Sequence, residues 1–137
     1  MTTKIFVIDD DSAVTDLLSV LLNTQGFQVW VTNSSSEGLT QIREKAPDLV
    51  ILDLMMPEMD GWEVCKAVRA FSDVPIIVLS ALNDPSMVAS VLDAGADDYL
   101  TKPTPSRVLV AHIKRLVDRK ASTVSVNQNL PGTLPAS

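Results

Sequence analysis

Residues 49–57 read LVILDLMMP, an apolar run that is interrupted by one carboxylate, Asp53. Four apolar residues in a row, without alternation, are typical of a strand buried on both faces of a parallel sheet. In such sheets the crevice that holds ligands lies just beyond the carboxyl ends of the strands. The stretch therefore predicts an α/β fold and makes Asp53 a candidate active residue, although an aspartate at a strand end can also simply cap a loop.

The composition allows one domain with a real hydrophobic core. The chain has 137 residues, 46% of them hydrophobic, and a formal charge of −6 that argues against direct contact with nucleic acid. The single cysteine, Cys65, excludes an internal disulfide bond. No apolar run approaches the length of a membrane span, and the first residues lack the pattern of a secretory signal. We therefore expect a cytoplasmic protein without membrane contact.

Four other short segments are predicted to be strands of the same sheet, and they cover residues 4–8, 28–32, 75–79 and 97–101. Segments with apolar residues at helical spacing follow the strands. Each begins at a capping residue, namely Asp11 or Ser12, Ser34, Asp60, Asp84 and Thr104. This alternation predicts a doubly wound five-stranded parallel sheet with five helices and right-handed crossovers.

The last predicted helix ends near residue 120 with a group of basic residues, so we expect residues 1–120 to form the folded domain. From residue 121 to residue 137 the composition changes to Ser, Thr, Asn, Gln, Pro and Gly. This change predicts a flexible tail or the start of an interdomain linker. The sequence leaves open whether an output domain follows residue 137 or whether the chain signals to a separate effector protein.

Polar residues follow four of the predicted strands and are expected to meet at one edge of the sheet: Asp9 and Asp10, Asp53, Ser80, and Lys102. Three carboxylates at one place repel each other by about 4 kcal/mol per pair at ~4 Å and an effective dielectric of 20. A divalent cation would relieve this repulsion, and hard oxygen ligands favour Mg²⁺, which often bridges carboxylates and a phosphoryl group. Lys102 and the Ser80 hydroxyl would then contact the remaining phosphoryl oxygens. The set predicts a phosphoryl-transfer site.

Through these polar residues at the strand ends, the chain resembles the receiver domain of bacterial two-component response regulators, and the chemotaxis regulators in particular. The resemblance covers about residues 4–120. It rests on five motifs in order, each at its own strand end: Asp9-Asp10, Asp53 four residues before Pro57, Ser80-Ala81, the sequence GADDY at 95–99, and Lys102-Pro103. The resemblance implies the flavodoxin-like strand order 2-1-3-4-5.

The resemblance also implies a role for each residue that would handle the phosphoryl group. Asp53 would accept it from a histidine kinase or a phosphotransfer protein, Lys102 would pair with Asp53 and then with the phosphoryl group, and Ser80 would bind it once it arrives. Tyr99 would turn inward as Ser80 moves, so that the surface of the fourth helix, fifth strand and fifth helix changes for downstream signalling. The Lys102–Pro103 peptide bond is expected to be cis.

For the metal, the resemblance implies that Asp10 binds Mg²⁺ directly and that Asp9 binds it directly or through water. Asp53 and the backbone carbonyl of Met55 would complete the protein's share of the ligands. The third acid, Asp11, is more simply explained as the cap of the first helix than as a ligand.

Two departures from common receiver sequences affect dimerisation and the lifetime of the phosphoryl group. Val108 and His112 stand where a winged-helix subgroup has a glutamate and an arginine for dimer salt bridges, so a phosphorylation-dependent homodimer of that charge-paired form is in doubt. Met55 and Leu82, two residues beyond Asp53 and Ser80, are apolar and would flank the path of a hydrolytic water. We therefore predict slow self-dephosphorylation.

Two other classes of protein, a hydrolase and a flavin-binding protein, fit these residues less well than a signalling switch. A hydrolase on a related fold needs an acid two residues after its nucleophile, where this chain has Met55, so a turnover enzyme is not expected. The acids after the first strand are electrostatically wrong for the phosphate of a flavin cofactor. The remaining alternative is an interaction module of the same fold that is not phosphorylated.

Overall fold

Five parallel strands form one sheet in a computed structural model that describes residues 2–129. The strands are β1 (Lys4–Ile8), β2 (Gln28–Thr32), β3 (Leu49–Leu52), β4 (Ile76–Ser80) and β5 (Asp98–Thr101). Their order in the sheet is β2-β1-β3-β4-β5, which confirms both the predicted fold and the predicted order. All four residues of β3 are buried, as the unbroken apolar run at 49–52 requires of the central strand.

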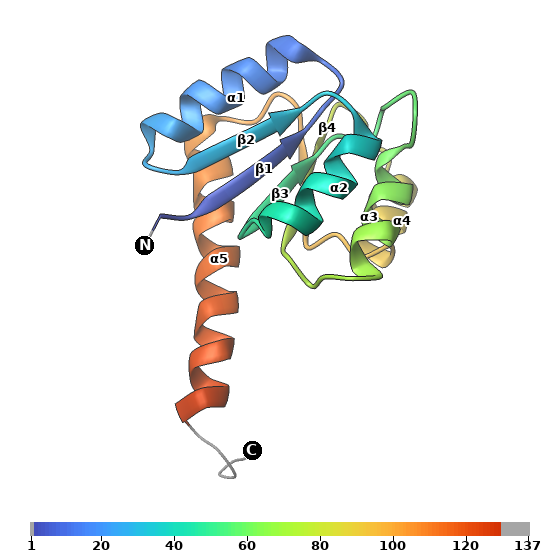
Figure 1. Cartoon of the computed structure of the whole chain (residues 1–137). Helices are drawn as coiled ribbons and strands as arrows, with labels where there is room; N and C mark the ends of the chain where they lie inside the picture. The colour runs from blue at the N-terminus through green and yellow to red at the C-terminus, as the bar shows by residue number, and fades with distance from the viewer. Residues whose placement is uncertain (1, 130–137) are drawn as a thin grey trace.

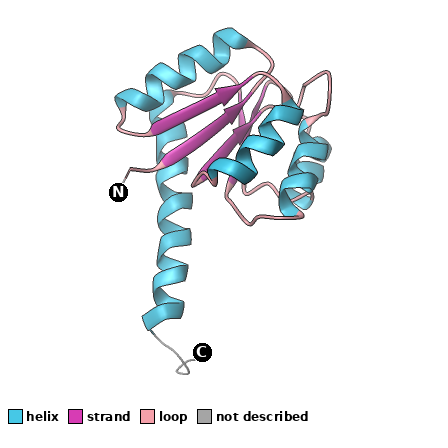
Figure 2. Ribbon diagram, viewed as in Figure 1, coloured by secondary structure: helices cyan, strands magenta, loops and turns pink. Residues whose placement is uncertain are grey.

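Five helices cover the two faces of this sheet (Figures 1 and 2). Helices α1 (Ser12–Thr24) and α5 (Ser106–Asn129) lie on one face, and α2 (Ser35–Lys45), α3 (Gly61–Arg69) and α4 (Pro85–Asp93) lie on the other. Alternate residues of the strands point to the two faces, so Phe6 and Ile8 join the core under α2 to α4, while Ile5 and Val7 join the core under α1 and α5.

The predicted capping residues begin four of the helices. Asp11 caps α1, and its carboxylate accepts a hydrogen bond of 2.9 Å from the amide of Ala13, which explains the third acid without a metal. Asp60 and Glu63 form the reciprocal capping box of α3, with each side chain bonded to the other residue's amide. These contacts fix the starts of α1 and α3, the two helices that follow the acidic residues.

Helix α5 differs from the prediction because it continues to Asn129 instead of ending at residue 120. Neither glycine nor proline occurs between residue 106 and Pro131, so nothing in the backbone chemistry stops the helix at the change of composition. The first part of the expected tail, residues 121–129, is therefore helical, and the rest of it, residues 130–137, lies outside the described residues. Whether this segment serves as a linker stays a prediction.

The apolar stripe of α1 also packs differently from the expected pattern. The helical spacing of Val14, Leu17, Leu18, Leu21 and Leu22 predicts one inward stripe. Leu18 and Leu22 are buried, but Leu17 is 64% exposed and Thr15 is buried in its place.

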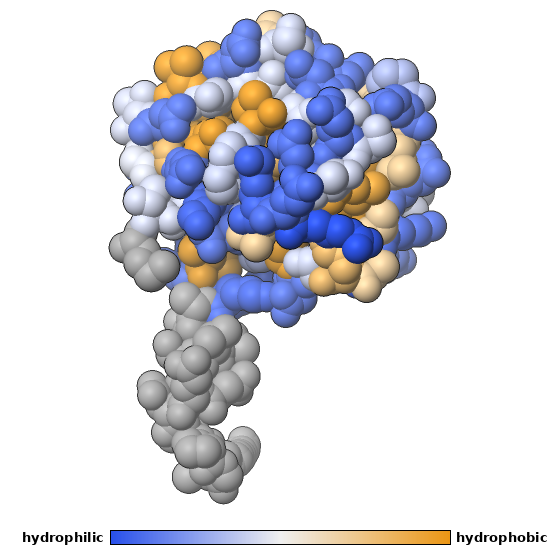
Figure 3. Space-filling model, viewed as in Figure 1, coloured by the Kyte–Doolittle hydropathy of each residue, from blue (hydrophilic) through white to orange (hydrophobic). Residues whose placement is uncertain are grey.

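On the face of the molecule shown in Figure 3, hydrophilic side chains predominate, with smaller hydrophobic areas between them. Within residues 2–129, we find no helix with the length and apolar character needed to cross a bilayer.

Candidate functional site

The parallel register of the sheet brings the polar residues at the strand ends to one edge. Ile8 at the end of β1 pairs with Leu52 at the end of β3, so Asp9 and Asp53 leave the sheet side by side. The amide of Asp53 donates to the carbonyl of Ile8 over 3.0 Å, and this bond fixes Asp53 at the point where β3 ends. The crevice predicted from residues 49–57 is therefore formed by β1, β3 and the neighbouring strand ends.

Three carboxylates, from Asp9, Asp10 and Asp53, gather at this edge with ligand oxygens within 4.8 Å of one another. Asp9 and Asp53 are only 3% and 6% exposed, whereas Asp10 points toward solvent. Their spacing and their hard oxygen donors fit a divalent cation such as Mg²⁺, which is often held by one or two carboxylates with several waters. The cluster could thus hold a metal ion with one side open to solvent.

Lys102 supplies the positive charge of the site. Its ammonium group lies 2.8 Å from a carboxylate oxygen of Asp9 and 3.7 Å from one of Asp53, so it is closer to Asp9 than to the predicted partner Asp53. Burial lowers the pKa of Lys102, but the hydrogen bond to Asp9 and the negative charge of Asp53 outweigh burial and raise it. Lys102 is therefore charged, and the bond between it and Pro103 is cis, as expected.

The pKa of Asp53 is raised above the ordinary aspartate value. Burial is the main cause, the charge of Asp9 adds to it, and the charge of Lys102 opposes it. The ionised form of Asp53 is thus held in a place where burial and a neighbouring carboxylate disfavour it. Two kinds of binding partner would relieve this conflict, namely a cation or a group that converts the carboxylate into an ester or anhydride.

The loop that follows Asp53 passes very close to the start of α3. The amide of Gly61 donates to the carbonyl of Leu54 over 3.0 Å, and a Cβ atom at Gly61 would lie 2.7 Å from the carbonyl oxygen of Asp53. Only glycine fits at this position without moving the backbone of the site. Beyond this contact the loop borders an open, mainly apolar cavity of about 420 Å³, to which Met55, 59% exposed, and Trp62 contribute.

Ser80 and Tyr99 both bind the backbone of Leu82. The hydroxyl of Ser80, which is fully buried, accepts a hydrogen bond of 3.3 Å from the amide of Leu82. The hydroxyl of half-buried Tyr99 donates to the carbonyl of the same residue. The β4–α4 loop therefore connects the two predicted switch residues, and sequence reasoning missed this link because a backbone group leaves no residue pattern.

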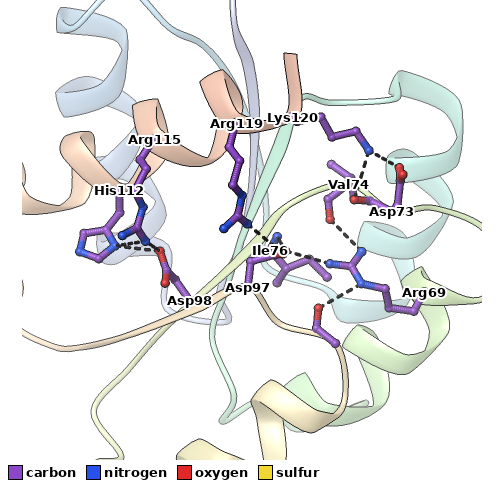
Figure 4. A network of polar contacts seen from close by, with 11 residues as sticks. Arg69, Asp73, Val74, Ile76, Asp97, Asp98, His112, Arg115, Arg119 and Lys120 are labelled. Atoms are coloured by element: carbon purple, nitrogen blue, oxygen red, sulfur yellow. Dashed lines mark hydrogen bonds and ion pairs between the residues drawn. The ribbon is translucent and has the colours of Figure 1, made fainter. Parts of the chain in front are cut away.

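The fifth strand is tied to its neighbours by a network of polar contacts (Figure 4). One carboxylate oxygen of Asp98 lies 2.8 Å from the Nδ1 atom of His112 and 2.6 Å from the guanidinium group of Arg115, both on α5. The preceding residue, Asp97, pairs with Arg69 of α3 over 3.0 Å and accepts a hydrogen bond from the amide of Ile76. His112 thus pairs within the chain, away from the acidic cluster.

Asn33 and Arg69 are two further positioning residues that sequence reasoning missed. The side-chain amide of Asn33 donates to the backbone carbonyl of Asp9 over 2.7 Å, so it braces the start of the acidic loop. Asn33 directly follows β2 and so lies at the same edge of the sheet as the acids, and this position could have indicated its role from the sequence. Arg69 binds the carbonyls of Ser72, Val74 and Gly95, and no sequence pattern indicates these backbone partners.

Comparison with known proteins shows which family and which solved structures this chain is similar to. The family described as "Response regulator receiver domain" matches residues 5–114. The DNA-binding response regulator MtrA of Mycolicibacterium paratuberculosis is 42% identical over 119 residues, which are 87% of this chain and 53% of the relative. The chain thus spans about half the length of this curated relative.

Two solved structures share the fold. The BeF3-activated receiver domain of Klebsiella pneumoniae RstA is 32% identical with a TM-score of 0.81, and the match covers 84% of this chain and 98% of that one. A CheY-like receiver domain protein from Methanospirillum hungatei is 27% identical with a TM-score of 0.85, over 90% of this chain and 99% of that one.

Proposed function

This chain belongs to the response regulator receiver family, and on that premise we propose that it is a phosphoryl-accepting signalling switch with Asp53 as the acceptor. The observation that carries the proposal is the placement of Asp53, which is 6% exposed, between two other carboxylates and the ammonium group of Lys102. A receiver domain is a signalling module and not a turnover enzyme. Its phosphoryl donor would be a histidine kinase or a phosphotransfer protein of the cytoplasm.

In the proposed reaction, a carboxylate oxygen of Asp53 attacks the phosphorus atom of a phosphohistidine. The bond between phosphorus and the imidazole nitrogen breaks, the imidazole keeps the electron pair and takes up a proton, and Asp53 becomes an acyl phosphate. Lys102 then balances the charge of the new phosphoryl oxygens, for which its distance of 3.7 Å from Asp53 is suitable. Asp53 thereby loses the ionised carboxylate that burial and Asp9 disfavour.

Asp9, Asp10 and Asp53, with the backbone carbonyl of Met55, are the proposed ligands of a divalent cation, for which Mg²⁺ is the best chemical match. When bound, Mg²⁺ neutralises negative charge on the carboxylates and on the transferred phosphoryl group. Asp9 is already paired with Lys102, so it can bind the cation directly or keep this pair and bind through water.

The proposed output passes through Ser80, Leu82 and Tyr99. The hydroxyl of Ser80 accepts from the amide of Leu82 and keeps its own proton to donate to a phosphoryl group on Asp53, and the carbonyl of Leu82 holds Tyr99. Movement of Ser80 toward the phosphoryl group would pull on the backbone of Leu82. A change at Ser80 therefore reaches β5 through one residue, and it alters the surface formed by α4, β5 and α5. A homodimer, an output domain beyond residue 137 or a separate effector protein would read this surface.

The test is the intact mass of the protein after incubation with acetyl phosphate, with and without Mg²⁺. Wild type should gain one phosphoryl group only with Mg²⁺, and Asp53→Ala should gain none. Size-exclusion chromatography of the same samples then shows whether phosphorylation causes dimerisation. No gain of mass under any condition would reject the proposal and favour an interaction module that works without phosphorylation.

The lifetime of the phosphoryl group should be long because apolar side chains stand where a polar group could hold a hydrolytic water. Met55 is 59% exposed beside the site, and Leu82 packs partly against the core. A Met55→Asn, Leu82→Glu double variant can hydrogen-bond this water, which is worth about 1 kcal/mol, or roughly a fivefold faster loss of the phosphoryl group. The decay of phosphorylated protein after removal of the donor measures the rate.

Val20→Glu is the matched control for this double variant, because it adds a charge at an exposed apolar position in the second half of α1. It should decay at the wild-type rate. Equal half-lives for wild type and the double variant would show that Met55 and Leu82 do not limit the access of water.

A further inference from the structure

Glu58, at the tip of the loop between β3 and α3, contacts the start of α2. One oxygen of its carboxylate accepts a hydrogen bond of 2.8 Å from the hydroxyl of Ser34, and the other accepts one of 3.2 Å from the hydroxyl of Ser36. Ser34 is also the N-cap of α2, and its hydroxyl oxygen accepts from the amide of Glu37. The contact joins two segments that are far apart in the sequence and that flank the acidic edge.

The electrostatics of the helix start favour this contact. The hydroxyls of Ser34 and Ser36, followed by the amides of Ser35 and Ser36, lower the pKa of Glu58, so its carboxylate is ionised at neutral pH. An anion at a helix N-terminus also interacts favourably with the helix dipole and with amides that lack partners in the helix. Glu58 remains exposed, so its partners and not burial define its position.

The loop has fixed points on both sides of Met55. It starts at Asp53, whose amide is bonded to β1, and it ends at Gly61, whose amide is bonded to the carbonyl of Leu54. Between these ends, Met56 is 8% exposed and anchors the loop in the core. Among the hydrogen bonds described for residues 2–129, those of Glu58 are the ones that join the tip of this loop to α2.

We propose that Glu58 is a positioning residue that holds the 53–60 loop against α2 and so limits the movement of the backbone carbonyl of Met55. The inference rests on the proposed function, because the carbonyl of Met55 matters there as a ligand of Mg²⁺. Residues that orient metal ligands typically contribute a factor of ten or more to metal affinity. Glu58→Ala should therefore weaken Mg²⁺ binding about tenfold without removing any ligand atom.

Calorimetric titration of Mg²⁺ into the unphosphorylated protein tests this inference. The Kd for Mg²⁺ should rise about tenfold in Glu58→Ala. A Ser34→Gly, Ser36→Ala variant should show most of this rise, because it removes both hydroxyl partners and glycine still serves as an N-cap. Adding Glu58→Ala to that variant should cause only a small further rise, since the weaker contacts with the amides of Ser35 and Ser36 are all that remain. At saturating Mg²⁺ the rate of phosphorylation should return to the wild-type value.

Glu37→Ala is the matched control, because it removes a carboxylate from the same first turn of α2 without touching the loop. Its Kd for Mg²⁺ should equal that of wild type. A second measurement needs no metal: amide hydrogen exchange of residues 55–60 should be faster in Glu58→Ala than in Glu37→Ala, with exchange in β3 unchanged. A loss of stability throughout the fold would instead change both regions.

The outcomes separate this inference from the proposed function. If wild type binds Mg²⁺ and gains a phosphoryl group while Glu58→Ala binds Mg²⁺ equally well, the role of Glu58 is rejected and the proposed function stands. If wild type neither binds Mg²⁺ nor gains a phosphoryl group, the proposed function is rejected, and the inference that rests on it falls with it.

Discussion

Replacing Lys102 with methionine is expected to slow phosphoryl transfer to Asp53 about a hundredfold and, at the same time, to strengthen Mg²⁺ binding. The rate falls because a donor aimed at developing negative charge typically contributes a factor of about 10² to 10³. Mg²⁺ binding becomes tighter because a competing positive charge, 2.8 Å from Asp9 and 3.7 Å from Asp53, disappears. A tenfold tighter Kd corresponds to about 1.4 kcal/mol, well within the interaction of charges at such distances.

Intact-mass time courses with acetyl phosphate give the rate, and calorimetric titration gives the affinity for Mg²⁺. Lys114→Met is the matched control, since Lys114 is an exposed lysine on α5. It should leave both values unchanged. Parallel losses of rate and Mg²⁺ affinity in Lys102→Met would mean that Lys102 mainly keeps the acidic edge folded, which contradicts the role proposed for it.

Replacing Asp53 with asparagine should raise the free energy of unfolding at pH 7 by on the order of 1 to 2 kcal/mol in the absence of divalent cations. Burial and the charge of Asp9 raise the pKa of Asp53, so its ionised form is less favourable in the folded protein than in the unfolded chain. Asparagine has nearly the same shape and removes one charge from three carboxylates within 4.8 Å of one another.

The pH dependence of this gain has a definite sign. The folded protein binds a proton at Asp53 more readily than the unfolded chain, so wild type loses stability as the pH rises from about 4 through the raised pKa of Asp53. The advantage of Asp53→Asn should therefore be largest at neutral pH and vanish near pH 4. Mg²⁺ should reduce it, because wild type keeps the third carboxylate as a ligand.

Urea unfolding of both proteins at several pH values, with and without Mg²⁺, measures these differences. Asp16→Asn on α1 is the matched control, because Asp16 is exposed and should give no comparable gain. A wild type that is more stable than Asp53→Asn at pH 7 without cations would show that Lys102 fully compensates the acidic cluster.

The central features of this fold and of its polar edge follow from short sequence patterns. Unbroken apolar runs such as residues 49–52 are typical of strands buried on both faces, and their alternation with helical segments predicts a parallel sheet with helices on each side. Once the strands are parallel, residues that follow them must share one edge, so the meeting of Asp9, Asp10 and Asp53 was predictable without coordinates.

Other features depend on information that the local sequence does not contain. Lys102 lies 2.8 Å from Asp9 and 3.7 Å from Asp53, a preference that depends on the tertiary placement of the two acids. Leu82 links Ser80 and Tyr99 through its backbone, which no side-chain pattern reveals. The exposure of Leu17 depends on how α1 rotates against β1 and β2. The change of composition at residue 121 does not mark the end of α5, because no helix breaker occurs before Pro131.

The length of α5 has a mechanical consequence. The helix runs past the edge of the sheet in Figure 1. Lys120 of this helix still contacts Asp73, which lies between α3 and β4. From residue 120 to Asn129 a helical rise of about 1.5 Å per residue gives an arm of ~13 Å. A tilt of ~10° at the base of such an arm displaces its end by roughly 2 Å at the same rise per residue. A helix of this length therefore converts a small tilt at its base into a larger displacement at its end.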